Sequence, residues 1–190
     1  AYTNVIAGQG AVLQAEASSI SATAGAEQGL GLISAVSSQE DVSEQDALLA
    51  SALVSGSLTG ADRVAFGQAV GREQGDTLLY QELFTPAELK TYNATLNSLA
   101  PAALQGTLST VQQGVMSGTP LSEIERLGLT AGSWQTMTAT WLHASNTAGT
   151  TTANTVLAAN ASPAIDAKRR LWAVGAVGAA GLILTLLVTI

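Results

Sequence analysis

The sequence predicts an all-α protein, an antiparallel four-helix-bundle-like domain followed by a C-terminal transmembrane helix. Strand signals are weak, because alternating Val and Ile are few and no Asn-Gly or Asp-Gly hairpin turn occurs. Long stretches instead carry apolar residues at helical spacing, with short loops between them. The chain then ends in about twenty residues without a charge. We therefore expect a helical domain over 1–167 and a basic run with a membrane helix over 168–190.

A first long helix is expected from about residue 3 to 37. Its apolar residues lie at roughly helical spacing: Val5, Val12, Leu13, Ile20, Leu30 and Ile33. A second helix should begin at Asp41 or Ser43, since either side chain can cap a helix, and should stop at Gly56. The expected apolar face of this second helix is Leu48, Leu49, Ala52, Leu53 and Val54.

Capping signals define the next two helices. Thr59 and Asp62 have capping-box spacing and predict the start of a third helix. Its expected core residues are Val64, Phe66, Val70, Leu78, Leu79 and Phe84. Thr85 as cap, Pro86 at the first helical position and Glu88 three residues after the cap predict the start of a fourth helix. Its apolar residues are Leu89, Tyr92, Leu96 and Leu99.

The rest of the domain should be helical as well. Pro101 is expected to kink or restart the fourth helix, which then runs to about Met116. A connector with one helical turn should follow. A last helix is expected to begin near Ser133, with core residues Trp134, Met137, Trp141, Ala144 and Ala148. Pro163 marks the expected seam before the terminal segment.

The terminal segment has the length and composition of a membrane span. Leu171–Ile190 would form a helix about 30 Å long, which matches a hydrocarbon core. Trp172 lies where an interfacial aromatic residue belongs. The alternative is a buried core helix of a soluble domain. Because Lys168–Arg170 precede the span, the positive-inside rule taken alone would place residues 1–167 in the cytoplasm.

Composition excludes several classes of function. Residues 1–167 carry four positive against fourteen negative residues, so no basic patch exists and no nucleic acid is expected as partner. The chain has no cysteine and one histidine, which argues against metal sites, and nothing in it implies a cofactor. With no catalytic motif, we predict no catalytic residues and no enzymatic activity for this chain. Since it begins with Ala1, we expect it to be a fragment.

Three residues of the third helix are candidates for contact with an anionic ligand. Arg72 lies beside Gln74 midway along this helix and is the first choice, and Arg63 lies near the helix start. Each arginine has an ordinary structural alternative. Arg72 can pair with Asp76 or with a neighbouring helix, and Arg63 can pair with an acid across the bundle.

Other notable residues have simpler interpretations. The pairs Glu40-Asp41 and Glu73/Asp76 are interpreted as helix-start charges and solvated faces rather than as an acid–base pair. His143 is a candidate pH-responsive group, with an exposed or hydrogen-bonded histidine as the alternative.

Residues 40–84 resemble the nitrate- and nitrite-sensing (NIT) domain of actinobacterial membrane sensor histidine kinases. The resemblance depends on hydrophobic and small residues in a fixed order: Asp46–Leu49, Ala52, Leu53, Gly56, Leu58, Thr59, Asp62, Phe66, Val70 and Gln74. The Trp134 helix, the basic run and the span follow in the order that the family shows. The resemblance implies a helical bundle outside the membrane, between two spans, with the basic run at the outer face.

The resemblance does not extend to the residues expected to bind nitrate. Family members are expected to use core-facing arginines, one of them in a Glu-Arg pair on the first long helix. Here Glu27 is followed by Gln28, which weighs against nitrate.

The sequence therefore predicts the extracytoplasmic sensing domain of a two-component sensor histidine kinase in the cell membrane. It should form a homodimer and bind a small anion, such as nitrate or nitrite, or a protein. The alternative function is a membrane-anchored structural or interaction protein without a small-molecule pocket.

Overall fold

The computed structural model describes residues 26–126 and 128–159, and these residues form helices without any strand. The helices are α2 (Ala26–Ser55), α3 (Gly60–Leu83), α4 (Pro86–Leu99), α5 (Ala102–Met116), α6 (Leu121–Arg126) and α7 (Ala131–Ala159). The expectation of an all-helical bundle is confirmed. The chain divides at Asn154 into two units, and residues 155–159 at the end of α7 belong to the second.

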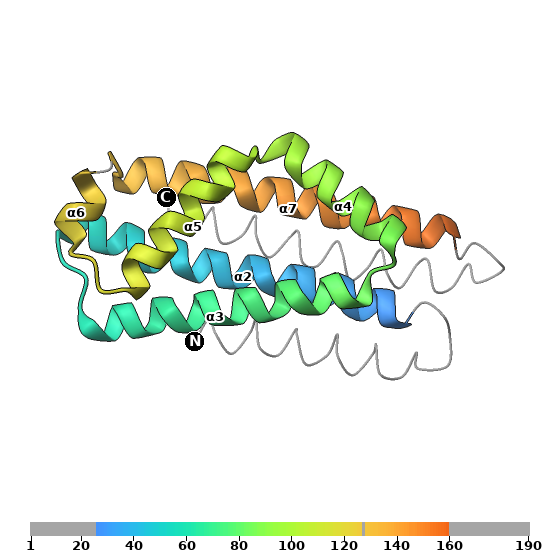
Figure 1. The fold of residues 1–190 in the computed structure, drawn as a ribbon, viewed down its shortest axis with the longest axis horizontal. Helices are drawn as coiled ribbons and strands as arrows, with labels where there is room; N and C mark the ends of the chain where they lie inside the picture. Colours follow the sequence, from blue (N-terminus) through green and yellow to red (C-terminus); the bar gives the residue numbers. More distant parts are fainter. Residues whose placement is uncertain (1–25, 127, 160–190) are drawn as a thin grey trace, which may run out of the picture. The chain divides into compact units, whose positions relative to one another are not determined.

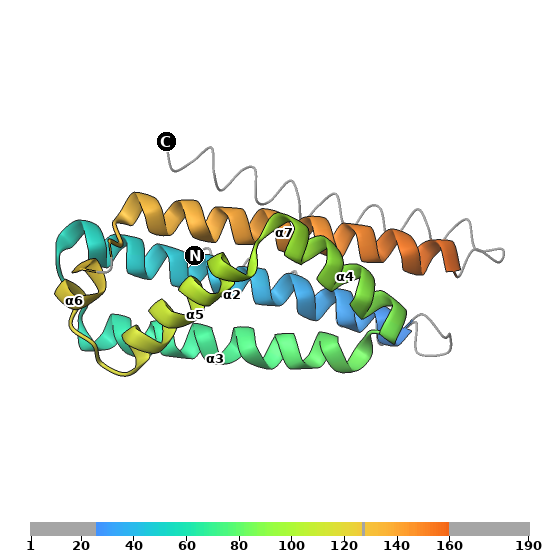
Figure 2. The same cartoon turned by 45° about the horizontal axis from the view of Figure 1, so that its top comes forward.

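Within the first unit, α2 and α3 form an antiparallel hairpin with close packing along their length (Figure 1). Helices α4 and α5 together make a third leg that bends between them, and α5 packs against α3. Helix α6 lies near one end of the bundle, against α2 and α5. The part of α7 up to Asn154 forms the fourth leg and runs in the same direction as α3, with α2 between them (Figure 2).

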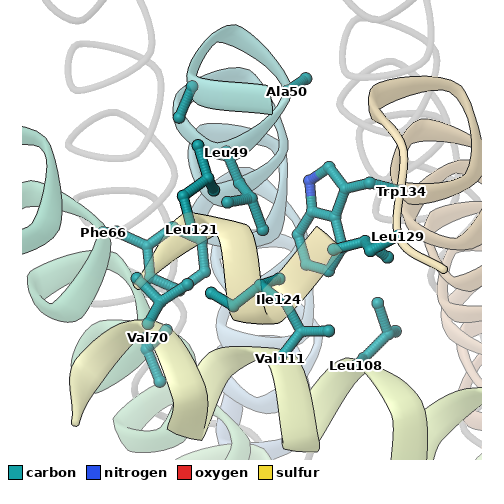
Figure 3. Close-up of a cluster of buried hydrophobic side chains, with 12 residues drawn as sticks. Leu49, Ala50, Phe66, Val70, Leu108, Val111, Leu121, Ile124, Leu129 and Trp134 are labelled. Atoms are coloured by element: carbon teal, nitrogen blue, oxygen red, sulfur yellow. The ribbon is translucent and has the colours of Figure 1, made fainter. Parts of the chain in front are cut away.

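Two apolar clusters fill the interior of this unit. One contains Leu49, Phe66, Val70, Val111, Val115, Ile124, Leu129 and Trp134, among others. Figure 3 shows Leu49, Ile124 and Trp134 converging from three helices toward its centre. The second cluster is built around three aromatic rings, Tyr80, Phe84 and Tyr92, whose centroids lie 5.0–5.9 Å apart. Gly31 of α2 leaves room for the Phe84 ring of this cluster. A Cβ atom at that position would lie 2.8 Å from the ring, which is too close.

The predicted helix starts at Thr59 and Thr85 are confirmed. Each threonine accepts a hydrogen bond from the backbone N–H three residues on, and the acid at that position accepts one from the threonine backbone N–H. Gly56 ends α2 with φ +69°, and the Ser57 N–H returns to the Ala52 carbonyl, as in a Schellman motif. Pro101 restarts the helix, because α4 ends at Leu99 and α5 begins directly after the proline.

The predicted boundary between a helix ending near residue 37 and another beginning at Asp41 or Ser43 is wrong. Helix α2 is continuous through this stretch. Neither predicted cap acts as one: the Ser43 hydroxyl donates inside the helix to the Gln39 carbonyl, and the Asp41 carboxylate accepts a hydrogen bond from Arg72 of α3. A serine that bonds back in this way is compatible with a helix interior. The first part of the predicted helix, residues 3–25, lies outside the described residues.

Several predicted core residues are on the surface instead. Val54, Val64 and Leu78 are 78%, 61% and 67% exposed, and Leu79 and Leu99 are also exposed. The buried face of α3 contains Phe66, Ala69, Val70 and Tyr80. The exposed α3 residues Val64, Leu78 and Leu79 fall outside this stripe. The buried face that was predicted from apolar residues alone is therefore wider than the one in the structure.

The last helix begins at Ala131, two residues before the predicted start. Thr130 caps it, since its hydroxyl accepts from the Ser133 N–H and the Ser133 hydroxyl accepts from the Thr130 N–H. Trp134, Ala144 and Ala148 are buried as expected.

None of the helices in the described part of the chain is long and apolar enough to cross a membrane. The predicted span Leu171–Ile190 and the seam at Pro163 lie outside that part.

Candidate functional site

Arg72 of α3 is held by two carboxylates of α2. Its Nε donates to Asp41 Oδ1 at 2.7 Å, and its Nη2 donates to Glu44 Oε2. Asp41 and Glu44 lie three residues apart, so both project from the face of α2 that meets α3. We call this set of three residues the Arg72 clamp. It confirms the structural alternative in which Arg72 pairs with a neighbouring helix.

The members of the Arg72 clamp differ in their exposure to solvent. The Asp41 side chain is 11% exposed, whereas those of Glu44 and Arg72 are 47% and 50% exposed. Burial raises the pKa of Asp41 and outweighs the opposing effect of Arg72. Packing around Arg72 works to lower its pKa, but the two carboxylates reverse this, so the pKa is raised overall. Asp41 is thus the fixed partner and Glu44 the replaceable one.

More acids surround the Arg72 clamp than one arginine can neutralise. The pKa of Glu40 is raised to about 6, first by loss of surrounding water and then by the carboxylates of Asp41 and Asp76. Burial and the Asp41 charge also raise the pKa of Asp76, which Arg72 only partly offsets. The α2–α3 face is therefore an acidic surface with its cation already engaged.

Next to the Arg72 clamp, Glu73 is held by two side-chain amides, with no cation among its partners in the described residues. Its Oε2 accepts from the side-chain amide of Gln112 at 2.9 Å and from that of Gln45 at 3.3 Å, and Gln112 also donates to Gln45 Oε1 at 2.8 Å. Burial raises the pKa of Glu73, and the two amides counteract this in part. This network joins α2, α3 and α5, and it is not the solvated face that the sequence predicted for Glu73.

Arg63 bonds to backbone carbonyls rather than to the acid that was its alternative partner in the sequence analysis. Its guanidinium donates to the carbonyls of Val115 and Thr119, at and just after the end of α5. The last carbonyls of a helix have no partner within the helix and carry partial negative charge, so a cation there is favourable. Arg63 therefore satisfies the end of α5.

The structure does not bring the three candidate residues to one place. Arg72 and Arg63 each have their own partners on different helices, and Gln74 is exposed. Gln28, at the position where the family is expected to have an arginine, has a buried side-chain oxygen without a hydrogen-bond partner in the described structure.

The sequence reasoning missed two polar contacts that attach α7 to the bundle. The Thr138 hydroxyl donates to Asp46 Oδ1 of α2 at 2.9 Å. The Tyr92 hydroxyl of α4 is 2.9 Å from the Ser145 hydroxyl, and burial raises the pKa of Tyr92. Thr138 and Ser145 lie seven residues apart, a spacing that puts both on one helical face. This spacing is the sequence feature that could have indicated the two contacts.

Two open depressions lie on the described surface. One, about 530 Å³, lies along α7, and another, about 350 Å³, lies beside α5 and Leu129. Neither is lined by a charged residue. In the described part of the chain, no group of three or more His, Cys, Asp or Glu side chains could hold a metal ion.

The helices and their contacts define a class, a helical bundle with part-buried polar links between its legs. The model of one family, described as nitrate and nitrite sensing (NIT), matches residues 1–161. This chain therefore belongs to the NIT family, as its sequence motifs indicated. No match was found among curated proteins or among solved structures.

Proposed function

We propose that residues 1–167 are the extracytoplasmic sensing domain of a membrane-bound sensor histidine kinase. The observation that carries this proposal is the match of the nitrate and nitrite sensing family to residues 1–161. In this proposal the domain binds a small ligand, such as nitrate or nitrite, or a protein, and passes the signal across the membrane through residues 168–190. Lys168–Arg170 would then lie at the outer surface of the membrane.

Among the described cations, Arg72 is the best candidate for contact with an oxyanion. It is half exposed, and a guanidinium is well suited to a planar anion. The anion would have to take the place of Glu44, the exposed partner, while Asp41 keeps its bond. Because α2 and α3 are joined at this point, the exchange would alter how they pack.

A ligand can only shift the conformation if it binds one packing of the bundle better than another. Helix α7 is the route outward, since it is joined to α2 by Thr138 and to α4 by Ser145. A change in α2 would therefore reach α7 at Thr138, and α7 leads toward the membrane segment. Small rotations or translations of a helix are an established way to transmit such a change.

Calorimetric titration of the full chain in detergent with nitrate, nitrite and chloride tests the oxyanion proposal. We expect nitrate or nitrite to bind, Arg72→Ala to abolish binding, and Glu44→Gln to strengthen it by removing the competing carboxylate. Lys90→Ala, which removes an exposed cation on α4, is the matched control and should bind as the parent chain does. Unchanged binding by Arg72→Ala would contradict the role of Arg72.

Protease treatment of intact cells tests the proposed orientation. We expect residues 1–167 to be digested from outside, and protection of these residues would show that the positive-inside rule had given the right answer.

A second candidate function is a membrane-anchored interaction protein without a ligand pocket. The uncharged lining of both open depressions favours docking of a protein over capture of an anion. A flat titration with every anion would favour this second function.

A further inference from the structure

We propose that Glu73, Gln45 and Gln112 form a proton-operated joint between α3, α2 and α5. The joint is closed while Glu73 carries a proton, and it loosens when Glu73 loses that proton. We call these three residues the Glu73 joint. The proposal goes beyond the proposed function, because it gives the domain a response to pH that needs no ligand.

The Glu73 joint is a point at which three helices share one set of hydrogen bonds. Glu73 Oε2 accepts from the Gln112 amide at 2.9 Å and from the Gln45 amide at 3.3 Å, and Gln112 also donates to Gln45 Oε1 at 2.8 Å. Each helix contributes one side chain, and the three side chains contact one another in a closed ring. A change of charge on Glu73 therefore acts on α2 and α5 together.

The Glu73 joint lies at the edge of the first apolar cluster. Gln45 is 1% exposed, and Glu73 is part-buried. Residues about one helical turn away on each of the three helices belong to that cluster: Leu49 on α2, Val70 on α3, and Leu108 and Val115 on α5. A carboxylate at this position loses part of its hydration, which makes its charged form costly.

The groups around Glu73 do not offset this cost with a cation. They are Glu40, Asp41 and Glu44 on α2, and Arg72, Asp76 and Tyr80 on α3, whereas α5 has no charged residue. Arg72 is engaged by the two carboxylates of its clamp. The described surroundings of Glu73 are therefore acidic or apolar, and its ring partners are neutral amides.

The sign of the response follows from the pKa of Glu73. Burial raises this pKa, the two amides oppose the rise in part, and the Asp41 charge adds to it. A closed joint therefore binds the Glu73 proton more tightly than a joint in which Glu73 reaches water. By linkage, the closed joint is favoured at low pH and loses stability as pH rises through the raised pKa. The sign is opposite to that of a salt bridge, which acid would break.

The middle of α5 is where the joint should loosen. When ionised Glu73 turns toward water, Gln112 keeps its bond to Gln45 but loses its bond to α3. One turn further on, the Val115 carbonyl still accepts from the Arg63 guanidinium, which holds the end of α5 to α3. We therefore expect a local change in α5 around Gln112 rather than unfolding of the helix.

Hydrogen exchange of the full chain in a neutral detergent at pH 5 and pH 7.5 tests the Glu73 joint. After correction for the intrinsic pH dependence of amide exchange, residues 108–116 should exchange several-fold more slowly at pH 5. Glu73→Gln is neutral at both pH values, so it should protect these residues equally at both. Glu82→Gln, which removes an exposed acid from the same helix, is the matched control for the loss of one negative charge and should keep the difference of the parent chain.

A second variant keeps the test valid if Glu73→Gln does not fold, which circular dichroism would show. Gln112→Ala removes the α5 member of the joint, so it should also abolish the pH difference, with residues 108–116 weakly protected at both pH values. The proposal is wrong if the parent chain shows no difference, or if a folded Glu73→Gln or Gln112→Ala retains it. An equal difference in residues 26–38, at the far end of α2, would indicate a change of the whole fold and would also overturn the proposal.

Discussion

The α2–α3 hairpin and the α5–α7 side of the bundle are stabilised in different ways. Between α2 and α3, charged and amide side chains meet across the interface, at the Arg72 clamp and where Gln45 donates to Glu73. Helices α5 and α7 have no charged residue. Apart from the polar contacts of Gln112, Thr138 and Ser145, their interior contacts centre on the apolar cluster around Val111, Leu129 and Trp134. The difference teaches that most of the described charged residues lie on α2 and α3, where an ion or a change of pH would act on the contacts between these two helices. On the uncharged side, away from Gln112, we expect the packing of α5 and α7 to stay the same when the pH changes or an ion is added.

The largest effect should come from the uncharged side, through Trp134→Ala. The Trp134 side chain is 1% exposed and lies in the first cluster (Figure 3). Truncating such a residue removes apolar contacts and leaves a cavity, so we expect a loss of about 3–5 kcal/mol in the free energy of unfolding. Urea unfolding followed by circular dichroism measures this loss.

Trp134→Phe is the matched control for that experiment. It keeps a ring and removes the indole N–H, which is buried without a partner among the described residues. We expect it to cost clearly less than Trp134→Ala. Equal losses would mean that the packing around Trp134 is not what stabilises this side.

On the charged side, Arg72→Ala should cost about 2 kcal/mol at pH 7.5, because Asp41 would be left buried and without its cation. The loss should be smaller than for a fully buried pair, since Arg72 is half exposed. At pH 5 it should shrink further, because the raised pKa of Asp41 brings its protonation closer to that pH. Thermal unfolding at the two pH values measures the difference, with Lys90→Ala as the control that should change neither.

A smaller effect is expected where α7 meets α4. Tyr92→Phe removes one buried hydrogen bond to Ser145 and should cost about 1 kcal/mol. Ser145→Ala should cost a similar amount, and the double variant should cost less than the sum, because the two hydroxyls are partners. Strict additivity would show that this bond does not couple the two helices.

The sequence predicted features that depend on neighbouring residues and failed on those that depend on the register between helices. The capping box at Thr59 and the helix end at Gly56 depend only on adjacent residues, so the sequence was sufficient to predict both. Arg72 could pair with Asp76 on its own helix or with Asp41 on α2. The outcome depends on how α2 and α3 align, which the sequence does not specify. The role of Glu73 depends on the same alignment.

The same reasoning explains the wrong helix boundary. A serine oxygen can cap a helix or bond back within one, and the sequence alone does not decide between the two. Ser43 bonds back to the Gln39 carbonyl, and α2 continues through it. Of the candidate site, the arginines could be found from the sequence, but their partners could not.

The smallest predicted effect is the pH dependence of stability that Glu40 contributes. In the folded chain its pKa is about 6, above its ordinary value of 4.5, so the folded state binds this proton more tightly than the unfolded state does. The contribution of Glu40 should therefore make the fold more stable as pH falls from about 7 toward 4.5. Glu40→Gln resembles the protonated form, so at pH 7.5 it should raise the melting temperature by on the order of 2 °C.

At pH 4.5 the advantage of Glu40→Gln should vanish, because Glu40 is then largely protonated in the folded parent chain. Glu82→Gln, which removes an exposed acid on the same helix as Asp76, is the matched control for the loss of one negative charge. Parallel curves of melting temperature against pH for Glu40→Gln and the parent chain would mean that Glu40 does not respond to its acidic neighbours. In that case the charged side would differ from the uncharged side in its contacts but not in its sensitivity to protons.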